Sequence, residues 1–345
     1  MNRSSIVTVL PLALAMLSMH PGAGAAQQPS TRPTASRSAP ANELLWVSNE
    51  ESRDVSVVRA ADMKELARIA VGERPRGIRA SADGRRIFVA LSDEHPNQES
   101  GRDAIVVIDA ASRRIVARHK AGTDPEQFGL SPDGRRLYAA NEDAGTASVT
   151  DLRSGRVMAT LVVGIEPEGV AVSPDGRWVY ITAETSNSVS VLDTKSNTIV
   201  ANMLVDVRPR AVAFAPDGRR AYVTAEIGGT VSTIDVGGHE VLETLDVAGA
   251  GGKPVGVVVS NDGRRVYIAN GAGNEVVVVD PASRRVVARI PVGRRPWGVA
   301  LSPDGRRLYS ANGLSNDVSV IDTRTNRVTG RVKVGTRPWG VAVTR

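Results

Sequence analysis

Charged and aromatic residues flank seven prolines that recur along the chain. Four of the six intervals between them are 42 residues long, and the prolines are Pro75, Pro125, Pro167, Pro209, Pro254, Pro296 and Pro338. The residues that follow them are Arg76, Glu126, Glu168, Arg210, Val255, Trp297 and Trp339, and those that precede them are Arg74, Asp124, Glu166, Arg208, Lys253, Arg295 and Arg337. Arginine and tryptophan recognise planar anions by charge-assisted hydrogen bonds and stacking, whereas a carboxylate can act as a general base. The residue types therefore favour a binding site or a hydrolytic site, provided that the fold brings the seven links together.

The elements that would position these residues are short strands, as the last repeat illustrates. Apolar residues alternate in 297–301, 307–311, 317–321 and 327–334, and each segment ends at a turn signal. The turn after the first strand ends in Asp-Gly in all six of its copies, which suits a tight hairpin. Four antiparallel strands in a unit of about 42 residues are typical of a propeller blade, so the sequence predicts an all-β, seven-bladed β-propeller.

The two ends of the repeat region are complementary. The first unit begins at 44–49, which matches a second strand, and the chain ends at 339–343, which matches a first strand. We expect the C-terminal strand to pair with the first blade, because closure removes the exposed edges of an open array. The predicted segments are a signal peptide (1–26), a flexible linker (27–41) and the propeller (42–345).

The first residues have the features of a Sec-type secretory signal. Arg3 precedes the apolar stretch 6–19, and Ala23-Gly24-Ala25 supplies small residues for cleavage. No later stretch is long and apolar enough to span a membrane, so we expect a monomeric periplasmic or secreted protein without a membrane span. The chain has no cysteine, which excludes disulfides, thiolate metal sites, covalently attached c-type haem and cysteine nucleophiles. The formal net charge of +6 permits anionic partners without identifying one.

Strand polarity places the proline links on the same face as the links between second and third strands. Each proline link leads into an innermost strand, so its residues should surround the mouth of the central channel. An arc of arginine and tryptophan would then face an arc of acids, with further acids at Glu50, Glu142, Glu184 and Glu226. The predicted binding residues are Arg74, Arg76, Glu126, Glu168, Arg208, Arg210, Arg295, Trp297, Arg337 and Trp339.

Several interpretations of this mouth are open at the level of sequence. The arginines and tryptophans could hold a small planar anionic ligand such as PQQ, or they could dock a protein. Alternatively, the charges could pair around the ring while the tryptophans pack beneath the loops. In a lactonase-like site, Glu126 or Glu168 would face Arg210 as base and carbonyl-polarising group. We expect no cofactor and no metal, because no dense Asp-x-Asp loop occurs and only His95 should reach this face.

The opposite face carries arginines and six turn aspartates, which are Asp83, Asp133, Asp175, Asp217, Asp262 and Asp304. Because each aspartate repeats with the fold, local turn hydrogen bonds explain the set without a ligand. No aromatic residues lie among the arginines to stack on bases, so we expect no nucleic-acid partner.

Several segments resemble the YVTN β-propeller family, among them Tyr222-Val223-Thr224. The runs 161–178, 205–235 and 314–322 are similar to the PQQ-dependent catabolism-associated group of these propellers. The resemblance covers the whole predicted propeller and implies an exported protein with a periplasmic partner: a quinoprotein dehydrogenase, a cytochrome or a transporter component. It implies no catalytic residues. The longer loop at 92–103 departs from the pattern, which leaves a shared partner surface there in question.

We therefore expect an exported, non-enzymatic β-propeller that acts as a binding or scaffold component, by resemblance in PQQ-dependent alcohol catabolism in the periplasm. The alternatives are a lactonase-like hydrolase that uses the channel mouth, or a binder of a planar anionic ligand such as PQQ. The first alternative requires a general base and a carbonyl-polarising group at the mouth.

Overall fold

The structure, a computed structural model, describes residues 39–40, 42–93 and 102–345. The predicted signal peptide (1–26), the linker up to residue 38, and 94–101 with His95 lie outside the described residues. Every regular element of the described part is a β-strand, and that part contains no helix long and apolar enough to cross a membrane.

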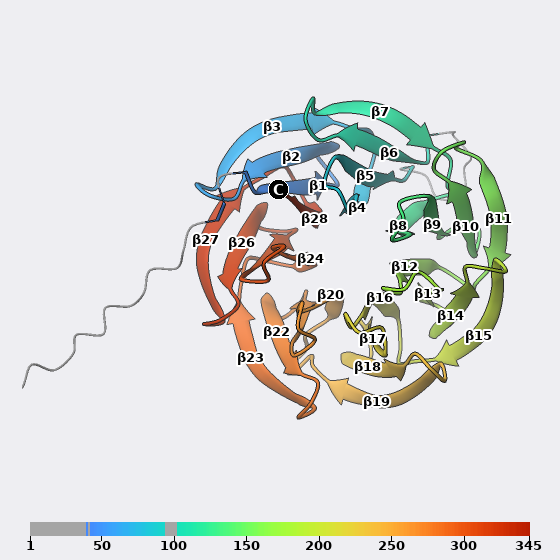
Figure 1. The fold of residues 1–345 in the computed structure, drawn as a ribbon. Coiled ribbons are helices and arrows are strands. Elements are labelled where there is room, and N and C mark those ends of the chain that lie inside the picture. The colour runs from blue at the N-terminus through green and yellow to red at the C-terminus, as the bar shows by residue number, and fades with distance from the viewer. Residues whose placement is uncertain (1–38, 41, 94–101) are drawn as a thin grey trace, which may run out of the picture. The chain divides into compact units, whose positions relative to one another are not determined.

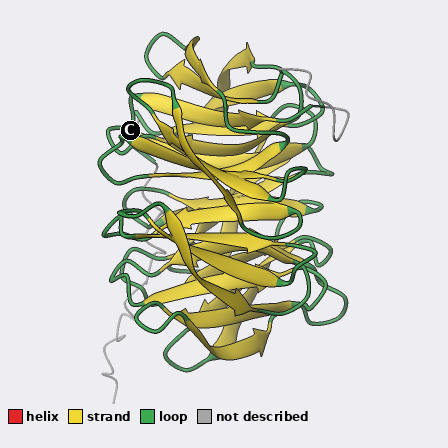
Figure 2. Cartoon of the chain, turned by 90° about the vertical axis from the view of Figure 1, so that its right-hand side faces the viewer, coloured by secondary structure: helices red, strands yellow, loops and turns green. Residues whose placement is uncertain are grey.

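Seven four-stranded antiparallel sheets are arranged around a central axis, as the ring of strands in Figure 1 shows. Each sheet is one blade of the ring. Seen from the side, the strands run between two faces, and loops cover both faces (Figure 2). This architecture confirms the predicted seven-bladed β-propeller.

Strands of equivalent position share their place in the blade, and their lengths differ by at most one residue. The innermost strands are β4 (Pro75–Ala80), β8 (Pro125–Leu130), β12 (Pro167–Val172), β16 (Pro209–Phe214), β20 (Pro254–Val259), β24 (Pro296–Leu301) and β28 (Pro338–Thr344). The second strands are β1 (Leu44–Asn49), β5 (Arg86–Leu91), β9 (Arg136–Asn141), β13 (Trp178–Ala183), β17 (Arg220–Ala225), β21 (Val266–Asn270) and β25 (Arg307–Asn312). The third strands are β2 (Asp54–Arg59), β6 (Ala104–Asp109), β10 (Thr146–Asp151), β14 (Ser188–Asp193), β18 (Thr230–Asp235), β22 (Glu275–Asp280) and β26 (Asp317–Asp322). The outer strands are β3 (Lys64–Ala70), β7 (Arg114–His119), β11 (Val157–Val162), β15 (Thr198–Leu204), β19 (Glu240–Asp246), β23 (Arg285–Pro291) and β27 (Arg327–Lys333).

Each innermost strand begins at one of the seven repeated prolines. The sequence predicts these prolines in the crossover before the strand, whereas the structure makes each of them the first strand residue. The first position tolerates proline because the missing N–H costs no hydrogen bond of the central ladder. A register shift follows at once, for example between Pro75 and Ile78 of β4.

The ring closes between its two ends, as the sequence predicts. The C-terminal strand β28 is antiparallel to β1, with Leu44 opposite Thr344 and Val47 opposite Val341. The indole N–H of Trp46 donates to the hydroxyl of Thr344 at 3.0 Å, which ties the last strand to the first inside the core. The first blade is therefore assembled from both ends of the described chain.

Apolar residues fill the spaces between neighbouring blades. One core cluster joins Trp46 of the first blade to Ile87 and Val106 of the second, and all three are fully buried. Third strands such as β14 are buried along their interior, whereas the outer strand β15 alternates between exposed and covered positions. Burial therefore decreases from the middle of each blade to its outer edge, as expected when only inner strands are covered on both faces.

The Asp-Gly turns are stabilised locally. In the turn before β5, the Ser81 hydroxyl donates to Asp83 at 2.6 Å, and the backbone N–H of Arg85 donates to the same carboxylate at 3.0 Å. The Ser81 hydrogen bond is the main cause that lowers the pKa of Asp83. The same serine–aspartate contact recurs at Asp133 and Asp304, at 2.5 and 2.6 Å. This confirms that turn hydrogen bonds account for these aspartates.

Removing residues 338–345 should destabilise the whole ring. The deletion unpairs β1 and uncovers Trp46, so the loss is several kcal/mol and the melting temperature falls by about 10 °C or more. Thermal unfolding followed by circular dichroism checks this, with removal of the exposed Arg345 alone as the matched control. An unchanged melting temperature without aggregation would contradict the role of β28 in closure.

Candidate functional site

The residue before each proline turns the chain sharply into its innermost strand. In six of the seven links this residue has a positive φ, from 37° at Arg74 to 62° at Arg208. A left-handed backbone is uncommon for residues that carry a Cβ, and it persists where neighbouring contacts hold it. The amides of Arg208, Arg295 and Arg337 each donate to an asparagine side chain at 2.9 Å. The links are therefore fixed from the blade that precedes them.

The corner between second and third strands lies directly beside the proline link in each of four blades. The corner residues donate their backbone N–H to the carbonyl of the residue before the proline, as in Glu142 to Asp124 at 3.1 Å and Glu226 to Arg208 at 2.8 Å. The equivalent bonds of Glu184 and Glu50 measure 2.8 and 2.9 Å. The proline links and the corner glutamates therefore lie together on one face, as the strand polarity predicts.

Arg74 and Arg76 form the centre of one charged cluster at the mouth. The Arg76 Nε lies 3.0 Å from Glu50, and its Nη1 is in contact with the fully buried carboxylate of Glu126. Arg74 lies 3.4 Å from Asp124 and 3.8 Å from both Glu50 and Glu126. Buried carboxylates need such partners, since an unpaired buried charge is costly.

Arg208 and Arg210 form a second cluster. Arg210, which is 9% exposed, contacts Glu184 through Nη1 and lies 3.4 Å from Glu168. Arg208 lies 2.6 Å from Glu184 and 3.5 Å from Glu226. The predicted pair of Glu168 and Arg210 is thus present in the structure.

The two tryptophans stack on each other beside this second cluster. The rings of Trp297 and Trp339 lie 6.1 Å apart between centroids, with 14° between their planes. The guanidinium of Arg295 lies 4.6 Å above Trp297, and that of Arg210 lies 5.5 Å from the same ring. Trp339 is 7% exposed, whereas Trp297 is half-buried. The tryptophans therefore form one aromatic wall of the mouth.

The charges of the mouth alternate instead of forming two opposed arcs. Arg295 lies 3.1 Å from Glu226, and Arg337 lies 3.3 Å from Glu50 and 2.8 Å from Glu51. The arrangement differs from the expected arginine arc opposite an acidic arc, because the corner glutamates insert between the arginines. Each of the predicted mouth arginines has at least one carboxylate within 4 Å.

Glu142 is a partly buried acid of the mouth with weak compensation. Among the described residues its one ion-pair contact is Arg76, at 4.0 Å, and its side chain is 25% exposed. Burial is the main cause that raises the pKa of Glu142 to about 7, and the nearby carboxylates of Glu168 and Asp124 raise it further. A carboxyl group with a pKa near 7 at the opening of a channel has the properties of a general base.

Three carboxylates converge at this point and could offer ligands to a cation. The oxygens of Asp124, Glu126 and Glu142 lie within 4.8 Å of one another. Two of the three already face arginines, Asp124 facing Arg74 and Glu126 facing Arg76. The convergence therefore explains the raised pKa of Glu142 more directly than it explains a metal.

Sequence reasoning placed Glu142 at the mouth but did not select it. It preferred Glu126 or Glu168 as base because they flank prolines, yet Glu126 is fully buried against Arg76 and Glu168 is 3% exposed beside Arg210. The signal that could have identified Glu142 is its position in an acidic corner next to Asp124.

Two family models match the chain, one after the other. Residues 202–338 match the seven-bladed β-propeller lactonase family, and residues 47–203 match the choice-of-anchor I domain. The chain is a β-propeller. No curated protein matches it.

Solved structures of similar propellers cover most of the chain. The periplasmic gluconolactonase of Pseudomonas aeruginosa is 26% identical, with a TM-score of 0.74 over 88% of this chain and 99% of that one. A putative 6-phosphogluconolactonase from Bacteroides uniformis is 19% identical, with a TM-score of 0.76 over 88% of this chain and 99% of that one. The hydrazine synthase of Kuenenia stuttgartiensis is 22% identical, with a TM-score of 0.69 over 78% of this chain and 89% of that one. The similarity to the last two proteins is a similarity of fold alone.

Replacing Glu142 should change how stability depends on pH. Because the folded state raises the pKa of Glu142 from 4.5 to about 7, stability that is present below pH 4.5 is lost as the pH rises to about 7. Glu142→Gln removes this loss, so the variant should gain stability relative to the native protein between pH 5 and 8. Urea unfolding at both pH values checks this, with the exposed Glu240→Gln as control. Parallel pH dependences of the native protein and Glu142→Gln would contradict the raised pKa.

Proposed function

We propose that this protein is a lactone hydrolase whose site is the mouth of the central channel. The observation that carries the proposal is Glu142, a carboxyl group with a pKa of about 7 that lies 4.0 Å from the guanidinium of Arg76. The match to the lactonase propeller family and the likeness to a periplasmic gluconolactonase support the same chemistry. The non-enzymatic scaffold expected from the YVTN resemblance has less support, and its PQQ-linked partner stays a prediction.

In the proposed reaction, Glu142 takes a proton from a water molecule as that water attacks the lactone carbonyl carbon. The negative charge that develops on the carbonyl oxygen is stabilised by an arginine, and Arg76 is placed for this because it lies nearest to Glu142. The tetrahedral intermediate then collapses, the ring C–O bond breaks, and protonated Glu142 returns its proton to the alkoxide. The product is a hydroxy acid, and Glu142 is again ionised.

The remaining ion pairs hold the reacting groups in place. Glu50 contacts the Nε of Arg76 and Glu126 contacts its Nη1, which limits the rotamers of Arg76 and holds the same Nη1 4.0 Å from Glu142. Trp297, which is half-buried and stacked on the buried Trp339, offers the exposed aromatic surface of this wall, against which the C–H face of a ring can pack. A polar lactone of sugar type fits a mouth of alternating charges with one aromatic wall.

The proposed location is the periplasm or the exterior, because the predicted signal peptide (1–26) favours export. An exported lactonase would act on lactones formed outside the cytoplasm. The known relative that supports this placement is the periplasmic gluconolactonase, which is 26% identical to the chain.

The proposal predicts measurable turnover of lactones. Hydrolysis of glucono-δ-lactone and of a panel of γ- and δ-lactones, followed with a pH indicator, should exceed the spontaneous rate and increase as the pH rises through about 7. Glu142→Gln should lower kcat by about 10²- to 10⁴-fold, the usual contribution of a general base. Glu240→Gln, far from the mouth on β19, should leave kcat unchanged. If no lactone of the panel is hydrolysed above the spontaneous rate, the proposal fails.

A further inference from the structure

An arginine projects from one innermost strand into the central channel. Arg79 of β4 lies opposite Phe88 of β5, and the same register in the other blades pairs a small or aliphatic residue with an aromatic one. The residues equivalent to Arg79 are Gly129, Ala171, Ala213, Val258, Ala300 and Ala342. A single strand therefore places a cation where six others place neutral side chains, and the fold does not require it.

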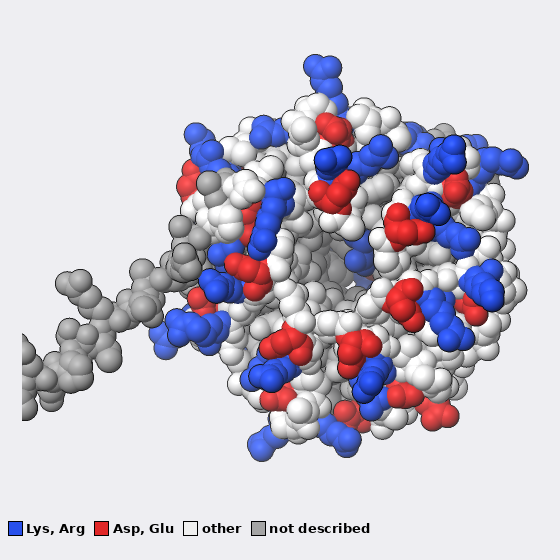
Figure 3. Space-filling view, viewed as in Figure 1, with Lys and Arg blue, Asp and Glu red and all other residues white. Residues whose placement is uncertain are grey.

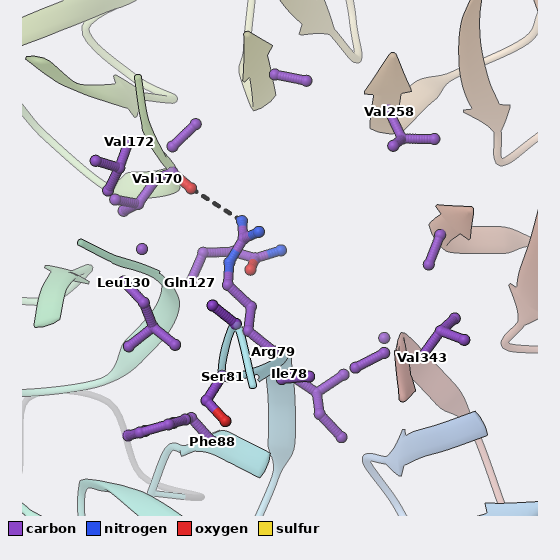
Figure 4. Close-up of a pocket in the computed structure, with 18 of the residues that line it drawn as sticks. Ile78, Arg79, Ser81, Phe88, Gln127, Leu130, Val170, Val172, Val258 and Val343 are labelled. Atoms are coloured by element: carbon purple, nitrogen blue, oxygen red, sulfur yellow. Dashed lines mark hydrogen bonds between the residues drawn. The ribbon is translucent and has the colours of Figure 1, made fainter. Parts of the chain in front are cut away.

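The Arg79 guanidinium is positioned by backbone carbonyls of two other blades. Its Nε donates to the carbonyl of Phe128 at 2.5 Å. Its Nη2 donates to the carbonyl of Val170 at 3.0 Å, the hydrogen bond drawn in Figure 4. A guanidinium has five N–H donors, and Nη1 makes no hydrogen bond to the described residues. The guanidinium is thus held in one orientation, and its Nη1 N–H groups remain available to a ligand.

Arg79 has no carboxylate partner among the described residues. Every predicted arginine of the mouth has one within 4 Å, but no ion pair involves Arg79. Burial alone lowers the pKa of Arg79, and no neighbouring acid acts against it. Because arginine stays protonated in proteins, the channel contains an uncompensated positive charge.

The space around Arg79 is a cavity of about 1280 Å³. The centre of the ring is visibly hollow in the space-filling view (Figure 3). Around the cavity the walls carry aliphatic side chains such as Leu130, Val172, Val258 and Val343, and the polar side chains of Gln127 and Ser81 also line it (Figure 4). The other charged side chains that line the cavity belong to the second and third strands and to the turns at one end, including Asp83, Arg85, Asp133 and Arg135. Those turn aspartates already accept local hydrogen bonds.

From this geometry we infer that the central channel binds a monocarboxylate with an apolar body, and that Arg79 binds its carboxylate. One fixed guanidinium with free N–H groups matches one carboxylate in shape and charge. The aliphatic walls favour a hydrocarbon body over a second charge or a sugar. This site differs from the proposed hydrolytic site because Arg79 takes part in none of the mouth ion pairs, although Trp339 of the mouth also lines the cavity.

Titration calorimetry with octanoate tests the inference. The native protein should bind one octanoate per chain, and Arg79→Met should weaken binding by about 10- to 100-fold, the effect expected for loss of charge-assisted hydrogen bonds. Arg264→Met, which removes an exposed arginine of a turn, should bind as the native protein does. The neutral analogue octanamide should bind the native protein and Arg79→Met equally weakly.

Thermal unfolding of the same variants separates a binding role from a structural one. Arg79 is half-buried and has no carboxylate partner among the described residues, so removing its charge should leave the melting temperature of unliganded Arg79→Met equal to that of the native protein or higher. Should Arg79→Met fail to fold, Arg79→Gln gives the same comparison, since it also removes the charge. Octanoate binding that is absent in the native protein, or unchanged in the folded Arg79 variant, would overturn the inference. Both outcomes are independent of lactone turnover.

Discussion

The pairing of β28 with β1 is the constraint on which the rest of the structure depends. The seven proline links join every pair of consecutive blades, so the ring is closed inside the first blade, where the antiparallel ladder from Leu44 to Thr344 pairs β28 with β1. Once the ring is closed, the seven innermost strands must face a common axis. Residues hundreds of positions apart in sequence, such as Arg76 and Trp339, then reach the same mouth without any contact specific to the pair.

Ring closure also brings charged side chains together at the mouth, where they form ion pairs. Seven links bring arginines and acids into a partly buried space, where an unpaired charge is costly. The pairing uses most of the acids: Glu126 with Arg76, and Glu184 and Glu168 with Arg210. Glu142 has only a distant arginine and two acidic neighbours, so it keeps its proton to about pH 7. The proposed general base is thus an acid that the surrounding ion pairs leave weakly compensated.

The fold was accessible from the sequence because every blade repeats the same local signals. The proline period, the Asp-Gly turns and the phase difference between 44–49 and 339–343 specify seven blades and their closure. The position of the mouth followed from strand polarity. The proposed general base could not be identified in this way, because the pKa of Glu142 depends on how acids and arginines of neighbouring blades pair with one another. Likewise, Arg79 is one strand residue among many in the sequence, and only the closed ring shows that it lacks a counter-charge.

Glu142 and Arg79 are opposite in charge, yet the same cause, removal from water, dominates the pKa shift of both. Each lowers the stability of the fold. The six positions equivalent to Arg79 carry no charge, and Glu142 differs from the corner glutamates Glu50, Glu184 and Glu226 in having an arginine no nearer than 4.0 Å. A propeller tolerates such costs because its stability is distributed over cores between all neighbouring blades, as between Trp46 and Ile87. A charged group that lowers the stability of the fold and faces the mouth or the channel can gain a favourable electrostatic interaction when a ligand binds. On that physical argument the mouth and the channel are two sites in one ring, one suited to proton transfer and the other to anion binding.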